Sequence, residues 1–169
     1  MPENRVHITQ GEYATGDTAD TVISTLLGSC VSVCLWDEVA RVGGMNHMLL
    51  AVSETNTGVC NLEGVNAMEI LINDIAKLGG QRHRLQAKVF GGAQMIAGLS
   101  SIGGKNAAFA LEFLENENIA CVGQSVGGTQ ARNLKFWPST GRVMQRVTGA
   151  DVPEVVKPVV TEGNDLELF

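Results

Sequence analysis

One thiol and one imidazole stand out as the side chains that could do covalent chemistry. Cys30 follows a Gly-Ser pair and opens the alternating run CVSVCLW, and His47 ends a second run, VGGMNH. An imidazole that takes the proton of a neighbouring thiol leaves a thiolate, which is a strong nucleophile. The small residues before the cysteine leave room for a carbonyl group, and backbone N–H groups at such a bend could hold the developing oxyanion. The pair predicts attack on an amide, ester or thioester.

Strand geometry brings these two side chains together. If the two runs are antiparallel strands joined by a turn at residues 37–40, Trp36 faces Arg41 and Cys30 faces His47. Directly opposed side chains have Cβ atoms about 4.5–5.5 Å apart, which suits a hydrogen bond from thiol to imidazole. The sequence therefore predicts that His47 lies beside Cys30 and lowers the pKa of its thiol. A cysteine that only packs beside a histidine is the alternative, because free cysteine is often buried as a plain hydrophobe.

A catalytic histidine usually has a third group that fixes its tautomer. Ser24 and Thr25, in the run TVIST that precedes the cysteine, both offer hydroxyls. Asn46 is next to the histidine, but successive side chains of a strand point to opposite faces. The residues alone leave the third group open.

Zinc and nucleotide binding fit the sequence less well. Cys30, Cys34, His47 and Cys60 have the residue types of a zinc site. On a strand rising about 3.3 Å per residue, however, the first two cysteines would lie about 13 Å apart, whereas zinc needs each sulfur about 2.3 Å away. VFGGAQMIAG and SVGGTQARN are rich in glycine but lack the pattern of a nucleotide-binding loop. Zinc therefore stays a minor alternative, and tight turns explain the glycines better than nucleotide binding.

The composition is typical of one soluble, cytoplasmic domain. The chain has 169 residues, 44% of them hydrophobic, and its net charge of −6 argues against a surface that binds nucleic acid. No apolar run approaches the roughly 20 residues that span a bilayer, and the polar start MPENRVHITQGE is not a signal peptide. Four cysteines are too few for a disulfide scaffold, so free thiols are expected. The prediction is one domain over residues 1–149 and a loosely ordered, acidic tail over residues 150–169.

Short β-like runs dominate the pattern of elements. They are RVHIT, TVIST, VSVCLW, VGGMNHMLL, LQAKVF, IACVGQSV, NLKFW and RVMQRV. Helical spacing over residues 66–78, which end at Gly79, predicts one helix. A second is predicted over residues 106–118, with Asn106 as its N-cap and Asn118 in the left-handed closing position. Groups of strands with single helices between them predict an α+β fold in which the helices pack on a sheet.

Longer motifs follow one another along the chain. They are GEYATG, STLLGSCVSVCLWD, RVGGMNHMLL, AKVFGGAQM and an N-x-x-F-x-x-x-F-L helix leading to GQSVGGTQARNLKF. Together they resemble the CheD family of chemoreceptor glutamine deamidases, over the chain to about Val147. The resemblance implies an α+β fold of layered β-sheets flanked by helices, related to the cytotoxic necrotizing factors. It also implies hydrolytic deamidation of glutamine to glutamate in methyl-accepting chemotaxis receptors, without metal or cofactor.

The resemblance also assigns roles to residues. It makes Cys30 the nucleophile and His47 the general base. The third catalytic residue of the family, a threonine six positions before the cysteine, falls on Ser24, with Thr25 as the alternative. The remaining cysteines are expected to be dispensable for chemistry. They are Cys34, Cys60 and Cys121.

Partners and rival functions follow from the same resemblance. The receptors are the protein substrate, and some members also bind a phosphatase of the CheC type. Two rival hypotheses remain: a non-catalytic adaptor that binds receptors and tunes signalling, and a transglutaminase- or methylesterase-like activity of the same thiol.

Overall fold

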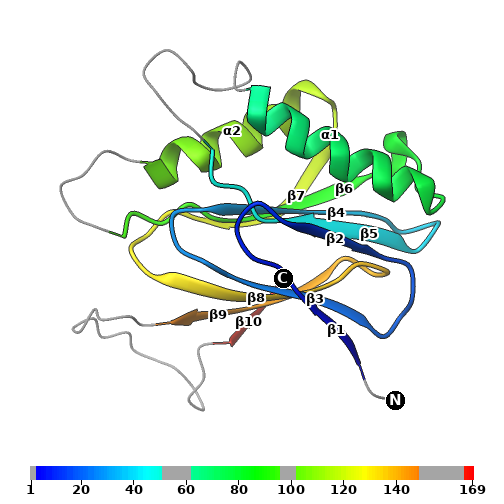
Figure 1. Ribbon diagram of the computed structural model, residues 1–169, viewed down its shortest axis with the longest axis horizontal. Helices are drawn as coiled ribbons and strands as arrows, with labels where there is room; N and C mark the ends of the chain where they lie inside the picture. Colours follow the sequence, from blue (N-terminus) through cyan, green and yellow to red (C-terminus); the bar gives the residue numbers. More distant parts are fainter. Residues whose placement is uncertain (1–2, 51–61, 96–101, 149–165) are drawn as a thin grey trace.

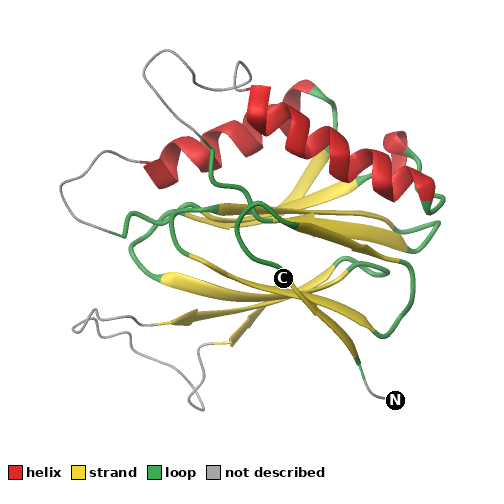
Figure 2. Cartoon of the chain, viewed as in Figure 1, coloured by secondary structure: helices red, strands yellow, loops and turns green. Residues whose placement is uncertain are grey.

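Three stacked layers make up the protein (Figures 1 and 2). The computed structural model describes residues 3–50, 62–95, 102–148 and 166–169. Two helices cover one face of a five-stranded sheet, and a second five-stranded sheet packs on its other face. The predicted α+β fold of layered sheets with helices is confirmed.

All eight predicted strands are present, and two short strands, β2 and β10, were not predicted. The strands are β1 (Asn4–His7), β2 (Tyr13–Gly16), β3 (Thr21–Leu27), β4 (Val31–Asp37), β5 (Val42–Asn46), β6 (Gln86–Gly91), β7 (Ala120–Val126), β8 (Ala131–Trp137), β9 (Arg142–Thr148) and β10 (Leu166–Leu168). The helices are α1 (Leu62–Lys77) and α2 (Ile102–Asn116), with a 3-10 turn at Arg82–Arg84.

The strand order separates the two sheets cleanly. The sheet next to the helices, here the central sheet, has the order β2-β5-β4-β6-β7. The other, here the outer sheet, has the order β1-β3-β8-β9-β10. The pairs β1/β3 and β6/β7 are parallel, and the remaining described pairs are antiparallel. The run before Cys30 thus belongs to the outer sheet, and the runs that carry Cys30 and His47 belong to the central one.

Strand β4 is the middle of the molecule, and all seven of its residues are buried. Val33 and Leu35 belong to the core cluster between the central sheet and the helices. Cys34 and Trp36 belong to the cluster between the two sheets. Because side chains alternate along a strand, β4 fills both cores at once. Complete burial of one such Val or Leu side chain contributes roughly 1.5–3 kcal/mol.

Both helices end where the sequence predicts. Gly79, just beyond α1, has φ of 107°, and Asn118, just beyond α2, has φ of 59°. These are left-handed conformations, which glycine and asparagine adopt most readily. Both predicted closing residues are confirmed.

Both helices begin four residues earlier than predicted. Helix α2 starts at Ile102, so Asn106 lies inside the helix and is not its N-cap, and that prediction is wrong. The sequence IGGK reads as a turn because glycine is a poor helix former. Gly103 has another purpose: a Cβ on it would lie 2.3 Å from the carbonyl oxygen of Ala93. The missing side chain lets the first turn of α2 pack directly against the chain after β6.

The hairpin between β4 and β5 differs from its predicted register. Trp36 pairs with Gly43, not with Arg41, and Asp37 pairs with Val42. The four loop residues are therefore 38–41, and Arg41 closes the loop at φ of 62°. The register is shifted by two residues from the prediction. An even shift keeps each side chain on its predicted face of the sheet.

Asp37 is the physical reason for this register. Its carboxylate accepts hydrogen bonds from the backbone N–H groups of Val39 and Ala40, and it forms a salt bridge with Arg84 at 2.8 Å. Burial opposes its ionisation, but the Arg84 guanidinium and the N–H groups of Gln81 and Ala40 outweigh burial and lower the pKa to about 2. The aspartate therefore ends the strand and anchors the turn, whereas the prediction places it within the turn itself.

The end of the chain joins the outer sheet. Residues 149–165 lie outside the described part, but β10 pairs with β9, and Phe169 packs edge-on against Phe90 with ring centroids 5.3 Å apart. The loosely ordered tail predicted over residues 150–169 includes this strand. Phe169 packs partly buried against the cluster between the sheets, and burial of aromatic surface stabilises the pairing of β10.

Replacing Asp37 by Asn should destabilise the protein in a pH-dependent way. Because its folded pKa of about 2 lies below the ordinary 3.8, the carboxylate stabilises the fold above about pH 4, and this contribution is lost as the pH falls through 2. We expect wild type to exceed Asp37→Asn by about 1–3 kcal/mol in unfolding free energy at pH 6. Urea unfolding at several pH values measures the difference, which should shrink towards pH 2. The exposed neighbour gives the control, since Glu38→Gln should match wild type throughout; a pH-independent difference would contradict the assignment.

Candidate active site

A hydrogen bond between the two sheets defines the position of the His47 ring. The Thr25 hydroxyl, on β3 of the outer sheet, lies 2.7 Å from Nδ1 of His47, just beyond β5 of the central sheet. Both side chains are buried, Thr25 completely and His47 to all but 6% of its surface. The imidazole therefore lies in the space between the sheets.

The partners of Thr25 determine the tautomer of His47. The Thr25 hydroxyl has one proton, and it donates that proton to the carbonyl oxygen of Ile8 at 2.7 Å. It can then only accept from His47, so Nδ1 carries the ring hydrogen. Nε2 is left with its lone pair, as a general base requires. The Ile8 carbonyl was not predicted, because a backbone acceptor leaves no mark in the sequence.

Ser24 lies on the other face of β3. Its hydroxyl is 3.1 Å from Nδ1 of His7, in an exposed pair. The resemblance predicts Ser24 in the orienting position, with Thr25 as the alternative. The structure reverses these two places, because Ile23, Thr25 and Leu27 are the residues of β3 that point into the core.

The turn at residues 9–12 holds the backbone of His47, and burial sets the charge state of its ring. His47 N donates to the carbonyl oxygen of Glu12 at 3.0 Å, and Gly11 N donates to the carbonyl oxygen of His47 at 2.9 Å. Burial lowers the pKa of His47, and the nearby His7 lowers it further, while the Glu12 carboxylate acts in the opposite direction. The imidazole is therefore neutral at pH 7.

Cys30 and His47 share a face of the central sheet but are not directly opposed. The bridge between Val31 and Met48 continues the β4–β5 register, so Cys30 falls opposite Leu49. The predicted direct opposition is wrong by two residues. Such diagonal neighbours on one face have Cα atoms about 7–8 Å apart, still within reach of long side chains. Among the described residues, no hydrogen bond joins the thiol to the imidazole.

Burial raises the pKa of the Cys30 thiol. This is the reverse of the predicted effect of His47. A neutral imidazole offers no positive charge to a thiolate, and a half-buried thiolate loses part of its hydration. In the free protein the pair is therefore an uncharged thiol beside an uncharged base.

The chain around Cys30 is held by the end of β6. Gly92 N donates to the carbonyl oxygen of Cys30 at 2.8 Å, and Ala93 N donates to that of Gly28 at 3.0 Å. Gly91 has φ of 111°, and a Cβ on it would lie 2.3 Å from the Cys30 carbonyl oxygen. Only glycine allows this approach, which fixes the backbone of the cysteine.

The other cysteines do not join this site. Cys34 is fully buried between the sheets, and burial raises the pKa of its thiol far above the ordinary range. Cys121 is exposed on β7, and Cys60 lies outside the described residues. Where the structure describes the chain, no three His, Cys, Asp or Glu side chains gather closely enough to hold a metal ion. No helix in the same residues is long and apolar enough to cross a membrane.

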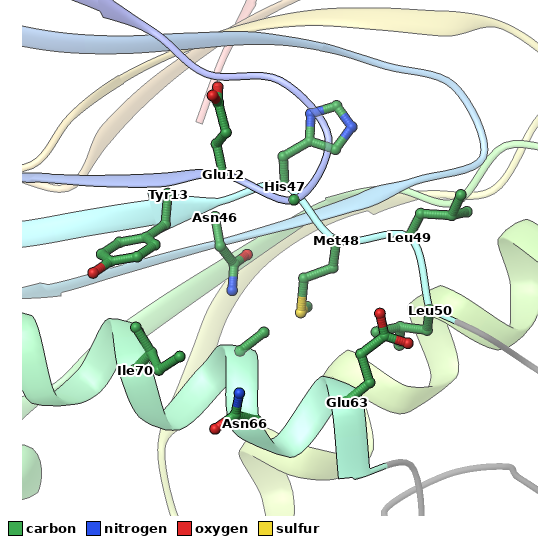
Figure 3. A pocket seen from close by; sticks show the side chains of 12 residues that line it. Glu12, Tyr13, Asn46, His47, Met48, Leu49, Leu50, Glu63, Asn66 and Ile70 are labelled. Carbon is green, nitrogen blue, oxygen red and sulfur yellow. The ribbon is translucent and has the colours of Figure 1, made fainter.

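A cavity of about 250 Å³ lies on the α1 side of β5 and of the residues that follow it (Figure 3). Figure 3 shows Asn46 and Met48 pointing towards α1, whereas the His47 ring points away from that helix. The Asn46 side chain is also hydrogen-bonded to β4, since its oxygen accepts from Val33 N at 3.0 Å. The cavity thus borders the backbone of His47, and the imidazole faces the opposite layer.

Comparison with known proteins identifies the class of the chain. A family model described as CheD chemotactic sensory transduction matches residues 49–147. A probable chemoreceptor glutamine deamidase CheD of Rhizobium leguminosarum bv. trifolii is 51% identical over 156 residues, which cover 90% of this chain and 85% of the relative. Relatives of the same name from Agrobacterium fabrum and Caulobacter vibrioides are each 45% identical and cover 98% of this chain and 96% and 93% of their own lengths.

These matches define an α+β protein of chemotactic sensory transduction. More narrowly, the chain belongs to the CheD family, which confirms the resemblance found in the sequence. Among solved structures, a Neisseria meningitidis protein of the DUF152 family model has a TM-score of 0.41 and 14% identity, covering 76% of this chain and 63% of its own. That similarity is too low to carry an argument about the fold.

The charge states of the pair predict how Cys30 reacts in the free protein. Iodoacetamide alkylates the thiolate, so the half-buried Cys30 thiol, whose pKa is raised, should react more slowly at pH 7.5 than the exposed Cys121 thiol. We expect the inflection of the Cys30 rate against pH, followed by peptide mass spectrometry, to lie above the ordinary pKa of a cysteine thiol, about 8.5. An inflection below that ordinary pKa would show a thiolate already stabilised by His47.

Proposed function

We propose that the protein hydrolyses the side-chain amide of glutamine residues in chemoreceptors, with Cys30 as nucleophile and His47 as general base. Membership in the CheD family supports the reaction, since the curated relatives carry the name chemoreceptor glutamine deamidase. The observation that carries the assignment of residues is the tautomer of His47: Thr25 holds Nδ1–H, so that Nε2 is free on the face that Cys30 shares.

The first half of the reaction forms a thioester. The Cys30 sulfur attacks the amide carbon of the glutamine side chain while its proton moves to Nε2 of His47. The resulting imidazolium gives that proton to the amide nitrogen, the carbon–nitrogen bond breaks, and ammonia leaves. Thr25 keeps the ring aligned through both transfers, because its hydroxyl stays hydrogen-bonded to Nδ1–H.

The second half uses water. Nε2 takes a proton from a water molecule, whose oxygen attacks the thioester carbon, and the carbon–sulfur bond then breaks. The sulfur leaves as a thiolate and takes the proton back from the imidazolium. The products are a glutamate side chain and the original uncharged pair.

Backbone N–H groups next to the nucleophile are suited to stabilise the oxyanion of both steps. Within the described part of the chain, the N–H groups of Ser29 and Cys30 donate to no other residue. The carbonyl oxygens of the same stretch are bound by Gly92 and Ala93, so the backbone is fixed while the donors remain available. Preorganised donors of this kind are worth about 3–4 kcal/mol each in acyl transfer.

An uncharged resting pair suits an enzyme whose substrate is a large protein. The thiol becomes nucleophilic only when a substrate excludes water and lets proton transfer to His47 accompany attack. A thiol that is not ionised in the free protein is also less open to oxidation. Binding of a phosphatase of the CheC type remains part of the proposal, with no contact in this chain assigned to it.

Receptor deamidation tests the proposal directly. Purified receptor cytoplasmic domains incubated with the protein should gain 1 Da at particular glutamines in peptide mass spectra, and Cys30→Ser should abolish the change while keeping the thermal melt and receptor pull-down of wild type. Cys121→Ser, at the exposed thiol, serves as the matched control and should remain active. Incorporation of an added amine would point instead to a transglutaminase, and receptor bound but unmodified would point to an adaptor. Either result overturns the proposal.

A comparison of the Ser24 and Thr25 hydroxyls tests which residue orients the His47 ring. Thr25→Ala removes the acceptor of Nδ1–H and should lower kcat about 10–100-fold, as when a catalytic histidine loses the partner that orients it. Ser24→Ala, one residue away on the exposed face, should stay within about 3-fold of wild type, a change near 0.6 kcal/mol. Steady-state deamidation of the same receptor fragment measures both. A crippled Ser24→Ala beside an active Thr25→Ala would place the orienting hydroxyl on the other face of β3.

A further inference from the structure

Asn106 is a polar side chain in an apolar place. It lies in α2 among the buried residues Ala107, Phe109 and Ala110, and it is itself completely buried. Burying an amide costs free energy unless its groups are hydrogen-bonded. The partners that it has found are therefore informative.

Both partners of Asn106 belong to the chain segments of the candidate active site. Its Nδ2 donates to the carbonyl oxygen of Ser29 at 2.8 Å, directly before Cys30. Its Oδ1 accepts from the backbone N–H of Leu50 at 3.3 Å, three residues after His47. One side chain thus holds the segment of the nucleophile and the segment of the base.

The register shows what this amide replaces. Val31 and Met48 exchange two backbone hydrogen bonds, of 2.9 and 2.8 Å. In an antiparallel ladder the next pair to exchange bonds lies two residues further on each strand, and here that pair is Ser29 with Leu50. The Leu50 N–H and the Ser29 carbonyl oxygen are instead bound to the two ends of the Asn106 carboxamide.

We propose that Asn106 is a positioning residue, whose carboxamide stands in the β4–β5 ladder and sets the separation of the segments that carry Cys30 and His47. An amide placed between a donor and an acceptor holds them further apart than a direct bond would. The two strands therefore separate just where Cys30 and Leu49 face each other, and the thiol lies at the opening. This inference rests on the proposed function, since it concerns the geometry of the same pair.

Positioning makes a different prediction from general stabilisation. Reacting groups displaced by about 1 Å can lose about 100-fold in rate with little change in binding. Asn106→Ala should therefore lower kcat about 10–100-fold and change KM less than about 3-fold. Leu114→Ala is the matched control. Leu114 is buried in the same helix, but its apolar side chain forms no hydrogen bond with the segments that carry Cys30 and His47. Its kcat should stay near wild type when all proteins are assayed well below their melting temperatures.

A second variant keeps the test open if Asn106→Ala does not fold. In Asn106→Asp, a protonated carboxyl can donate to Ser29 O and accept from Leu50 N–H, whereas an ionised carboxylate cannot donate. The ratio of its kcat to that of wild type should be near one at low pH and should fall as the introduced carboxyl ionises. A flat ratio, or an Asn106→Ala kcat equal to that of Leu114→Ala, would overturn the proposal.

Hydrogen exchange separates this proposal from the proposed function. The Leu50 amide should lose protection in Asn106→Ala but keep it in Leu114→Ala, whatever reaction the protein catalyses. If wild type modifies no glutamine, the proposed function fails. If wild type is active, and Asn106→Ala neither exposes the Leu50 amide nor lowers kcat, the positioning role alone fails.

Discussion

The double burial of β4 is the constraint on which the rest of the structure depends. The register of a strand that is buried on both faces is strongly fixed, because a shift by one residue would move each of its side chains into the other core. Cys30 stands at the start of this strand, and its side chain belongs to the layer between the sheets. The direction of the thiol is therefore set by Val33 and Leu35 packing under the helices on the opposite face. The position of the nucleophile follows from the same hydrophobic burial that stabilises the fold.

The site joins three parts of the fold, each supplying something the others lack. The outer sheet supplies Thr25, whose two hydrogen bonds fix the protonation of the His47 ring. The central sheet supplies Cys30 and His47, and helix α2 supplies the carboxamide of Asn106. Because the partner that fixes the His47 tautomer belongs to the other sheet, loss of contact between the sheets would leave the ring without a fixed tautomer.

Much of this arrangement could be predicted from the sequence, and the failures have physical reasons. The strands follow from alternation, and the helix ends follow from Gly79 and Asn118. The hairpin register could not be predicted, because it depends on Asp37 meeting Arg84, a residue distant in sequence. Choosing between Ser24 and Thr25 failed because TVISTLL carries apolar residues on both faces of the strand. For the hydrogen bonds of Asn106, the sequence offers one signal, a polar residue within an apolar helix.

The edge of the outer sheet has a consequence for how the protein behaves at high concentration. Among the described residues, three pairs join β10 to β9, and the carbonyl and N–H of Phe169 add two bonds to Val143. Such a short strand opens locally far more readily than the whole domain unfolds. While it is open, β9 presents unpaired backbone groups, and the surface of Phe90 loses its aromatic cover. Opening of β10 would therefore expose an aggregation-prone edge without unfolding the domain, so that overall stability and resistance to aggregation are separate properties of this fold.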